Sequence, residues 1–81
     1  MIVRVQLFAV ARQRVGQSEI TLELPIQARV TDLRAQLIRE FPALSDILPR
    51  VRIALNAEYE SDETLLSESS EIAIIPPVSG G

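Results

Sequence analysis

The chain ends in Gly80-Gly81, two of only three glycines among its 81 residues. Glycine has no Cβ, so a terminal pair presents an α-carboxylate with the least steric bulk and can enter a narrow tunnel in another protein. The Gly81 carboxylate is therefore the candidate reacting group, and Gly80 gives it clearance. The alternatives are a frayed terminus or an expression scar.

The residues before this pair favour a projecting tail. Residues 71–75 alternate as a β-strand, which ends at two consecutive prolines. Proline has no N–H to donate to a sheet and favours an extended backbone, so the pair directs the chain away from the fold. The expected tail, flexible at its tip, comprises Pro76, Pro77, Val78, Ser79, Gly80 and Gly81.

Three residue types that often perform chemistry are missing from the chain. It has no histidine and no cysteine, which excludes the usual zinc, iron–sulfur and Cys/His catalytic sites. We therefore expect no metal, no bound cofactor and no catalysis by this chain on its own. All eight basic residues are arginines. The lack of lysine either spares an activated C-terminus from attack by an amine of the same chain or reflects genome composition or heat adaptation.

Length and hydropathy indicate one small folded domain with a single modest core, since 47% of 81 residues are hydrophobic. The apolar runs are too short to span a membrane, and the N-terminus lacks the layout of a signal peptide. We therefore expect a cytoplasmic protein that does not interact with a membrane.

Charge is divided unevenly along the sequence. Residues 1–52 carry all eight arginines and five acidic residues, whereas residues 53–81 carry six acidic residues and no base. The acidic half bears the tail, so nucleic acid is disfavoured as a partner. An acidic rim at the base of the tail would suit a basic docking surface on another protein. Ordinary solvated loop charge is the alternative.

The hydrophobic pattern predicts an α+β roll in which a mixed sheet packs on one main helix. Strands are expected at residues 2–8, 18–24, 51–55, 58–60 and 71–75, with a short helix at 9–15 closed by Gly16. A linker covers residues 43–50, and Asn56-Ala57 is a candidate hairpin turn. We expect the first two strands to pair antiparallel and the last strand to lie beside the first. The domain is expected to cover residues 1–76 and the tail residues 77–81.

The central helix is the best-marked element. Thr31 is the expected N-cap, Asp32 lies in the first turn, and Pro42 stops the helix. Its apolar stripe is expected to comprise Val30, Leu33, Leu37, Ile38 and Phe41. The predicted core comprises Val3, Val5, Leu7, Leu22, Leu33, Leu37, Phe41, Leu55, Ile72 and Ile74.

The chain resembles ubiquitin-like β-grasp proteins in its length, its strand order and its terminal Gly-Gly. The closing segment Ile74-Ile75-Pro76-Pro77-Val78-Ser79-Gly80-Gly81 is similar to that of the small, sulfur-carrier subunit of molybdopterin synthase. Leu7-Phe8-Ala9 with Arg12 and Gly16, and the segment from Leu55-Asn56 to Thr64-Leu65, also resemble this family. Two departures are Ser69-Ser70, where the family usually has Gly-Asp, and Ile74-Ile75, where paired aromatics are common.

The resemblance implies a carrier mechanism. An adenylating enzyme related to ubiquitin-activating enzymes would use ATP and Mg²⁺ to convert the Gly81 carboxylate to an acyl adenylate. A sulfur donor protein would displace AMP and leave a thiocarboxylate. The tail would then deliver sulfur to cyclic pyranopterin monophosphate in the large subunit of the synthase. The resemblance also implies two small subunits at opposite ends of a large-subunit dimer, with the catalytic groups supplied by the partner.

The family pattern also indicates where this chain docks. By position in that pattern, the partner interface is expected to include Phe8, Tyr59, Ile75 and Val78. Core or sheet packing is the alternative for Phe8 and Ile75, whereas Tyr59 lies on a polar stretch that favours exposure. Arg12 is expected to pair across the interface, with an ordinary surface arginine as the alternative.

Two other functions stay open at this stage. The first is a sulfur carrier for thiamine synthesis or tRNA thiolation, which uses the same chemistry with another acceptor. The second is a ubiquitin-like protein modifier or plain interaction module, which would give isopeptide conjugates or a stable complex with an unmodified terminus.

Overall fold

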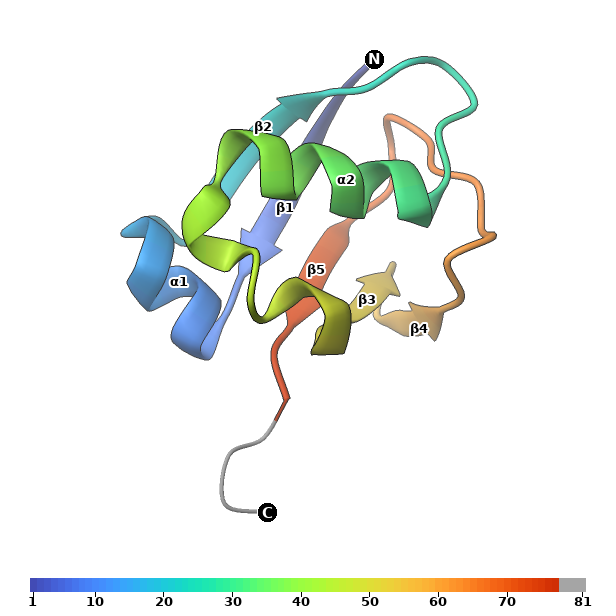
Figure 1. Ribbon diagram of the computed structural model, residues 1–81. Coiled ribbons are helices and arrows are strands. Elements are labelled where there is room, and N and C mark those ends of the chain that lie inside the picture. The colour runs from blue at the N-terminus through green and yellow to red at the C-terminus, as the bar shows by residue number, and fades with distance from the viewer. Residues whose placement is uncertain (78–81) are drawn as a thin grey trace.

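The computed structural model describes residues 1–77 and consists of one five-stranded sheet with its helices on one face (Figure 1). The strands are β1 (Ile2–Leu7), β2 (Glu19–Glu23), β3 (Arg52–Leu55), β4 (Glu58–Glu60) and β5 (Ile72–Ile75). The helices are α1 (Ala9–Val15) and α2 (Val30–Glu40), with two 3₁₀ turns, η1 (Pro42–Leu44) and η2 (Leu48–Arg50). No helix within residues 1–77 is long and apolar enough to cross a membrane.

The sheet is mixed, with strand order β2-β1-β5-β3-β4. β1 pairs antiparallel with β2 and parallel with β5, while β3 pairs antiparallel with both β5 and β4. The predictions that the first two strands pair antiparallel and that the last strand lies beside the first are therefore confirmed. The arrangement places β5, from which the tail leaves, in the middle of the sheet.

The core fills the space between the sheet and α2. Alternation along each strand turns one set of side chains inward, and nine of the ten predicted core residues are buried. Phe41 is the exception. It is only partly buried because α2 ends at Glu40 and Phe41 follows with φ −130° and ψ 73°, outside the helical course. Ile38 is also not part of the buried stripe, since it lies 40% exposed on the flank of α2.

The predicted N-cap of the central helix is wrong by two residues. The helix begins at Val30 with Arg29 as N-cap, so Thr31 lies inside the first turn. The Asp32 carboxylate accepts a hydrogen bond from the Arg29 backbone N–H at 2.8 Å. The N–H groups of Val30 and Thr31 are satisfied by the carbonyls of Thr64 and Asp62, at 3.0 and 3.1 Å. A distant loop therefore replaces the cap that the Thr31 side chain was expected to supply.

The segment between α2 and β3 is more ordered than a linker. η1 and η2 each contain a proline in their first positions, where its fixed φ favours a helical turn. Leu44, Ile47 and Leu48 from this segment are buried in the core. Arg34 on α2 donates hydrogen bonds to the carbonyls of Leu48 and Val51 at 2.6 and 2.9 Å. These contacts fix the approach to β3.

The predicted hairpin turn joins β3 and β4. Asn56 and Ala57 both adopt left-handed backbone angles, with φ of 51° and 70°, as expected for a two-residue hairpin with two positive φ values. Alanine is strained in this region. We expect Ala57→Gly to raise the free energy of unfolding by about 1 kcal/mol, measured by urea denaturation.

Ala43→Gly provides the matched control for this turn. Ala43 is exposed in η1 and has no positive φ, so removal of its Cβ relieves no strain and should lower stability slightly. A loss of stability in Ala57→Gly equal to that of the control would contradict the assignment of strain to the turn.

Candidate functional site

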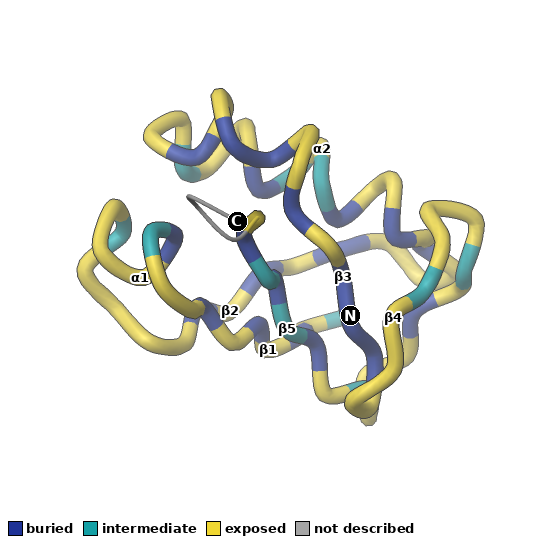
Figure 2. The backbone as a smooth tube through the Cα atoms, turned by 90° about the horizontal axis from the view of Figure 1, so that it is seen from below, coloured by how far each residue is buried: buried dark blue, intermediate teal, exposed yellow. Residues whose placement is uncertain are grey.

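The tail leaves the fold at the end of β5. Pro76 is buried and Pro77 is exposed, so the chain reaches the surface between the two prolines. Figure 2 looks onto this end of the molecule and shows α1 on one side of it and β3 on the other. Val78, Ser79, Gly80 and Gly81 lie outside the described residues. Their predicted roles, the flexibility of the tail and the domain boundary after residue 76 therefore stay predictions.

The sheet face opposite the helices carries a strip of apolar side chains beside this exit. In the register of the sheet, Ala73 of β5 lies opposite Ala54 of β3, which in turn lies opposite Tyr59 of β4. Ile75, half-buried, lies on the same face as Ala73 because side chains two residues apart in a strand point the same way. Tyr59 is 55% exposed. β3 therefore joins the two predicted interface residues Tyr59 and Ile75 into one surface.

Phe8 extends this surface across β1. It is 47% exposed, which rules out the core packing considered as its alternative. Its φ of −128° and ψ of 155° continue the extended course of β1, and the preceding residue, Leu7, lies opposite Ile74. Continuing the register places Phe8 alongside Ile75. We call the surface formed by Phe8, Ala54, Tyr59, Ala73 and Ile75 the tail-base patch.

Three residues of this region were missed in the sequence as site candidates: Arg52, Ala54 and Ala73. The alternation of residues 51–55 was enough to point Arg52 and Ala54 outward, because Val51, Ile53 and Leu55 point inward. The order of the strands was needed to place them between Tyr59 and Ile75.

Arg12 lies on α1 one turn after Phe8, and its backbone N–H donates a hydrogen bond to the Phe8 carbonyl at 3.4 Å. It is exposed on α1 and lines a shallow hollow with Ala9, Gln13 and Gly16. Its predicted ion pair with a partner stays a prediction.

A neighbouring arginine fixes the position of α1 beside the tail. Arg14 donates hydrogen bonds to the Ala43 carbonyl, at 3.1 Å, and to the carboxylate of Asp46. The hydrogen bond from Arg14 holds the pKa of Asp46 below its ordinary value of 3.8. The pair ties α1 to the segment that precedes β3.

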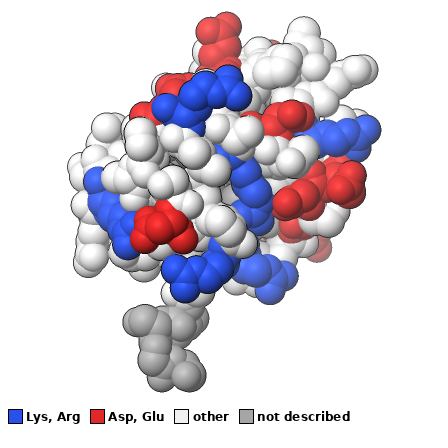
Figure 3. Space-filling view, viewed as in Figure 1, with Lys and Arg blue, Asp and Glu red and all other residues white. Residues whose placement is uncertain are grey.

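The expected acidic rim at the base of the tail is wrong for the positions nearest to the exit. Arg52 lies directly opposite Ile75 in the register, and Figure 3 shows basic side chains around the point where the chain leaves the fold. Antiparallel pairing sets the start of β3 against the end of β5. Glu71 precedes β5 and so lies at its opposite end, while Asp62 is paired with Arg34 at 3.0 Å.

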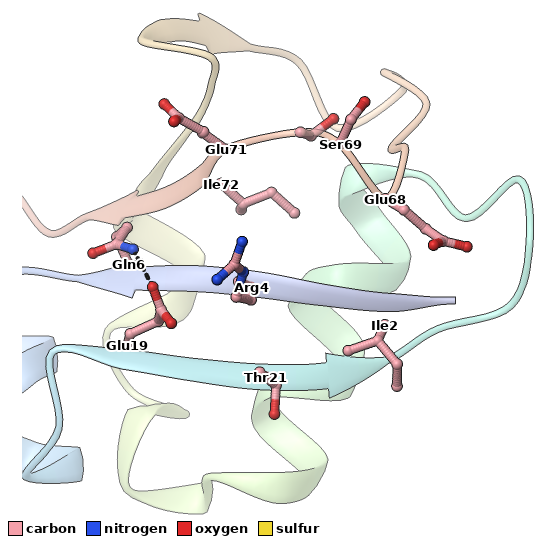
Figure 4. A pocket seen from close by; sticks show the side chains of 10 residues that line it. Ile2, Arg4, Gln6, Glu19, Thr21, Glu68, Ser69, Glu71 and Ile72 are labelled. Carbon is pink, nitrogen blue, oxygen red and sulfur yellow. Dashed lines mark hydrogen bonds between the residues drawn. The ribbon is translucent and has the colours of Figure 1, made fainter.

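A second hollow lies on the outer face of the sheet near the start of β5 (Figure 4). Its lining includes Arg4, Thr21, Ser69 and Glu71, so it carries both signs of charge and lies at the opposite end of β5 from the tail. Among residues 1–77, no group of three or more histidine, cysteine, aspartate or glutamate side chains is placed to hold a metal ion.

Residues 5–81 match the model of the ThiS family. The chain belongs to the ThiS family. This ThiS-family chain is 42% identical over 83 residues to the molybdopterin synthase sulfur carrier subunit of Chlamydomonas reinhardtii, and the match covers 100% of both chains. The resemblance seen in the sequence is thereby confirmed.

Solved structures of ubiquitin-like proteins confirm the β-grasp fold of this ThiS-family chain. The crystal structure of SAMP1 from Haloferax volcanii superposes with a TM-score of 0.87 at 25% identity and covers 100% of both chains. A chain from the complex of subunits 1 and 2 of the molybdopterin-converting factor of Helicobacter pylori 26695 superposes with a TM-score of 0.70 at 27% identity, again over 100% of both chains.

Proposed function

We propose that this chain is the sulfur-carrier subunit of a molybdopterin synthase. The observation that carries the proposal is the full-length match to the molybdopterin synthase sulfur carrier subunit of Chlamydomonas reinhardtii, at 42% identity. The terminal Gly80-Gly81 supplies the unhindered carboxylate that such a carrier requires.

The proposed chemistry takes place at the Gly81 carboxylate. An adenylating enzyme related to ubiquitin-activating enzymes transfers AMP from ATP to the carboxylate, with Mg²⁺, and releases pyrophosphate. A sulfur donor protein then supplies sulfur that displaces AMP from the acyl carbon, giving a thiocarboxylate. The thiocarboxylate sulfur forms a C–S bond to the acceptor, cyclic pyranopterin monophosphate, in place of a C–O bond that breaks. Water then hydrolyses the resulting thioester, which leaves the sulfur on the acceptor and restores the carboxylate. Two deliveries supply the two sulfurs of the dithiolene.

The length of the tail limits what the folded part of this chain can contact. The six residues from Pro76 to Gly81 span at most about 20 Å when fully extended. With the tail inserted in a partner, the side chains around Ile75 then lie at the mouth of the tunnel and Gly81 at its end. The acids, bases and cations that act on the acceptor therefore come from the partner, and this chain has a non-catalytic, sulfur-donating role.

The proposed partner is the large subunit of the synthase, and the tail-base patch is the proposed contact surface together with Val78 and Arg12. The exposed aromatic side chains of the tail-base patch, Phe8 and Tyr59, are of the type that anchors protein interfaces. A similar protein from Helicobacter pylori has been solved as a complex of subunits 1 and 2 of molybdopterin-converting factor. By analogy with the family, we propose a heterotetramer with two small subunits on a large-subunit dimer.

The test is reconstitution from purified components. The protein carrying a C-terminal thiocarboxylate is mixed with the large subunit and cyclic pyranopterin monophosphate, and both the dithiolene product and the intact mass of the carrier are measured. We expect product to form while the carrier returns from thiocarboxylate to carboxylate. A thiocarboxylate that persists beside an active large subunit would reject this acceptor in favour of thiamine synthesis or tRNA thiolation.

A protein-modifier function is the second candidate, favoured by the close superposition on SAMP1, which in Haloferax volcanii is a small archaeal modifier protein. It predicts isopeptide conjugates between Gly81 and lysines of other proteins. Mass spectrometry of the tagged chain recovered from its host under denaturing conditions would detect them.

A further inference from the structure

Beside the tail-base patch, Arg52 is paired with Tyr59 of the patch, and the fold does not explain the role of this pair. Arg52 is the first residue of β3, and Tyr59 is the middle residue of β4. Tyr59 lies opposite Ala54 in the register, so its ring reaches diagonally to Arg52 on the same face. The guanidinium carbon, Cζ of Arg52, lies 4.1 Å from the centroid of the Tyr59 ring, the geometry of a cation–π contact.

The stacked guanidinium keeps its hydrogen-bond donors available. Among residues 1–77, the ion pairs are Arg14 with Asp46 and Arg34 with Asp62, and neither these nor the side-chain hydrogen bonds of that part of the chain involve the Arg52 side chain. Stacking on a ring face occupies the π surface of the guanidinium and leaves its N–H groups at the edge. The side chain is exposed, stacked on Tyr59 and without an ion pair within the described fold.

The location of this pair connects it to the tail. Arg52 lies directly opposite Ile75, one residue before Pro76. A protein that receives the tail must bring the mouth of its tunnel against this position. The reacting carbon of Gly81 lies up to about 20 Å further along the chain, so Arg52 acts on docking and is not a catalytic residue.

We propose that Arg52, held in position by Tyr59, binds an aspartate or glutamate carboxylate at the tunnel mouth of the large subunit. The inference rests on the function proposed above. A planar guanidinium offers two parallel donors that match a carboxylate, and ordering by the ring lowers the entropy lost when the contact forms. In the register, Ile75 lies opposite Arg52 and Ala54 lies opposite Tyr59, so apolar side chains flank the pair on this face. A partner that covers these side chains would shield the contact from water, as at the centre of an interface.

The experiment measures binding of the full-length chain to the purified large subunit, with dissociation constants and dissociation rates for wild type and variants. We expect Arg52→Glu to weaken binding by about 30-fold or more. Arg52→Lys keeps the charge but loses the two parallel donors, and we expect a loss of about tenfold, which is about 1.4 kcal/mol. Arg39→Glu is the matched control, because Arg39 is exposed on α2, on the opposite face of the sheet. It should bind within about twofold of wild type.

Tyr59 variants test the positioning role. Tyr59→Phe keeps the ring and should bind as wild type, whereas Tyr59→Leu removes the stacking surface and should weaken binding about fivefold through the cost of ordering Arg52. In the Arg52→Lys background, Tyr59→Leu should weaken binding by less than it does in the wild-type chain, because the two residues act as a unit.

The outcomes separate this inference from the proposed function. If the wild-type chain binds the large subunit and transfers sulfur while Arg52→Lys binds with wild-type affinity, the carboxylate contact is overturned and the carrier function stands. If the wild-type chain does not bind the large subunit, the proposed function fails and the inference fails with it. Reduced binding of both Arg52 variants, recovered for Arg52→Glu by changing one carboxylate of the large subunit to arginine, establishes the contact.

Discussion

Deletion of Gly81 should reduce sulfur transfer to the large subunit to background, a loss of more than about 10²-fold. One residue of extended chain corresponds to about 3.5 Å, and a displacement of even 1 Å at a reacting centre costs about 10²-fold. The new terminal carboxylate would stop short of both the nucleotide in the activating enzyme and the acceptor in the synthase. Transfer is measured as dithiolene product per carrier in the reconstituted reaction.

The folded part of the chain should not respond to this deletion. The last buried residue among residues 1–77 is Pro76, five residues before Gly81, so the thermal unfolding midpoint should match that of wild type. Ser79→Ala is the control, because it keeps the tail length and removes one hydroxyl. Transfer by the Gly81 deletion at a rate comparable with this control would reject the terminal carboxylate as the sulfur-bearing group.

Replacement of Ile74 by alanine should cost about 3 kcal/mol of unfolding free energy. Ile74 is 0% exposed and lies between Leu7 of β1 and Ile53 of β3 in the centre of the sheet. Small domains have only about 5–15 kcal/mol of total stability, and an 81-residue chain is expected near the lower end of that range. A substantial fraction of the variant should therefore unfold on mild heating, as measured by circular dichroism and urea titration.

Ile26→Ala tests whether burial causes this loss. The two substitutions remove the same atoms, but Ile26 is 80% exposed, so its replacement should change stability by no more than about 0.5 kcal/mol. Equal losses in the two variants would contradict the assignment of Ile74 to the core.

The sequence by itself predicted the elements whose signals are local. Alternation along the strands identified the inward side chains, the pair Asn56-Ala57 marked a hairpin, and Gly16 closed the short helix at φ 83°. The terminal glycines identified the candidate reacting group, and the Pro-Pro-Val-Ser-Gly-Gly ending carried the family resemblance that the match to the ThiS family confirms. Each of these signals depends on residues within a few positions of one another, so a linear sequence contains them in full.

The tertiary structure decided what depends on residues distant in sequence. The start of α2 is set by the carbonyls of Asp62 and Thr64, more than 30 residues away, so the local preference of Thr31 for an N-cap did not determine it. The charge beside the tail is also a consequence of strand pairing. The last 29 residues carry only acidic charge, yet antiparallel pairing of β3 with β5 brings Arg52 against Ile75. The surface that meets a partner was therefore determined by the order of the strands.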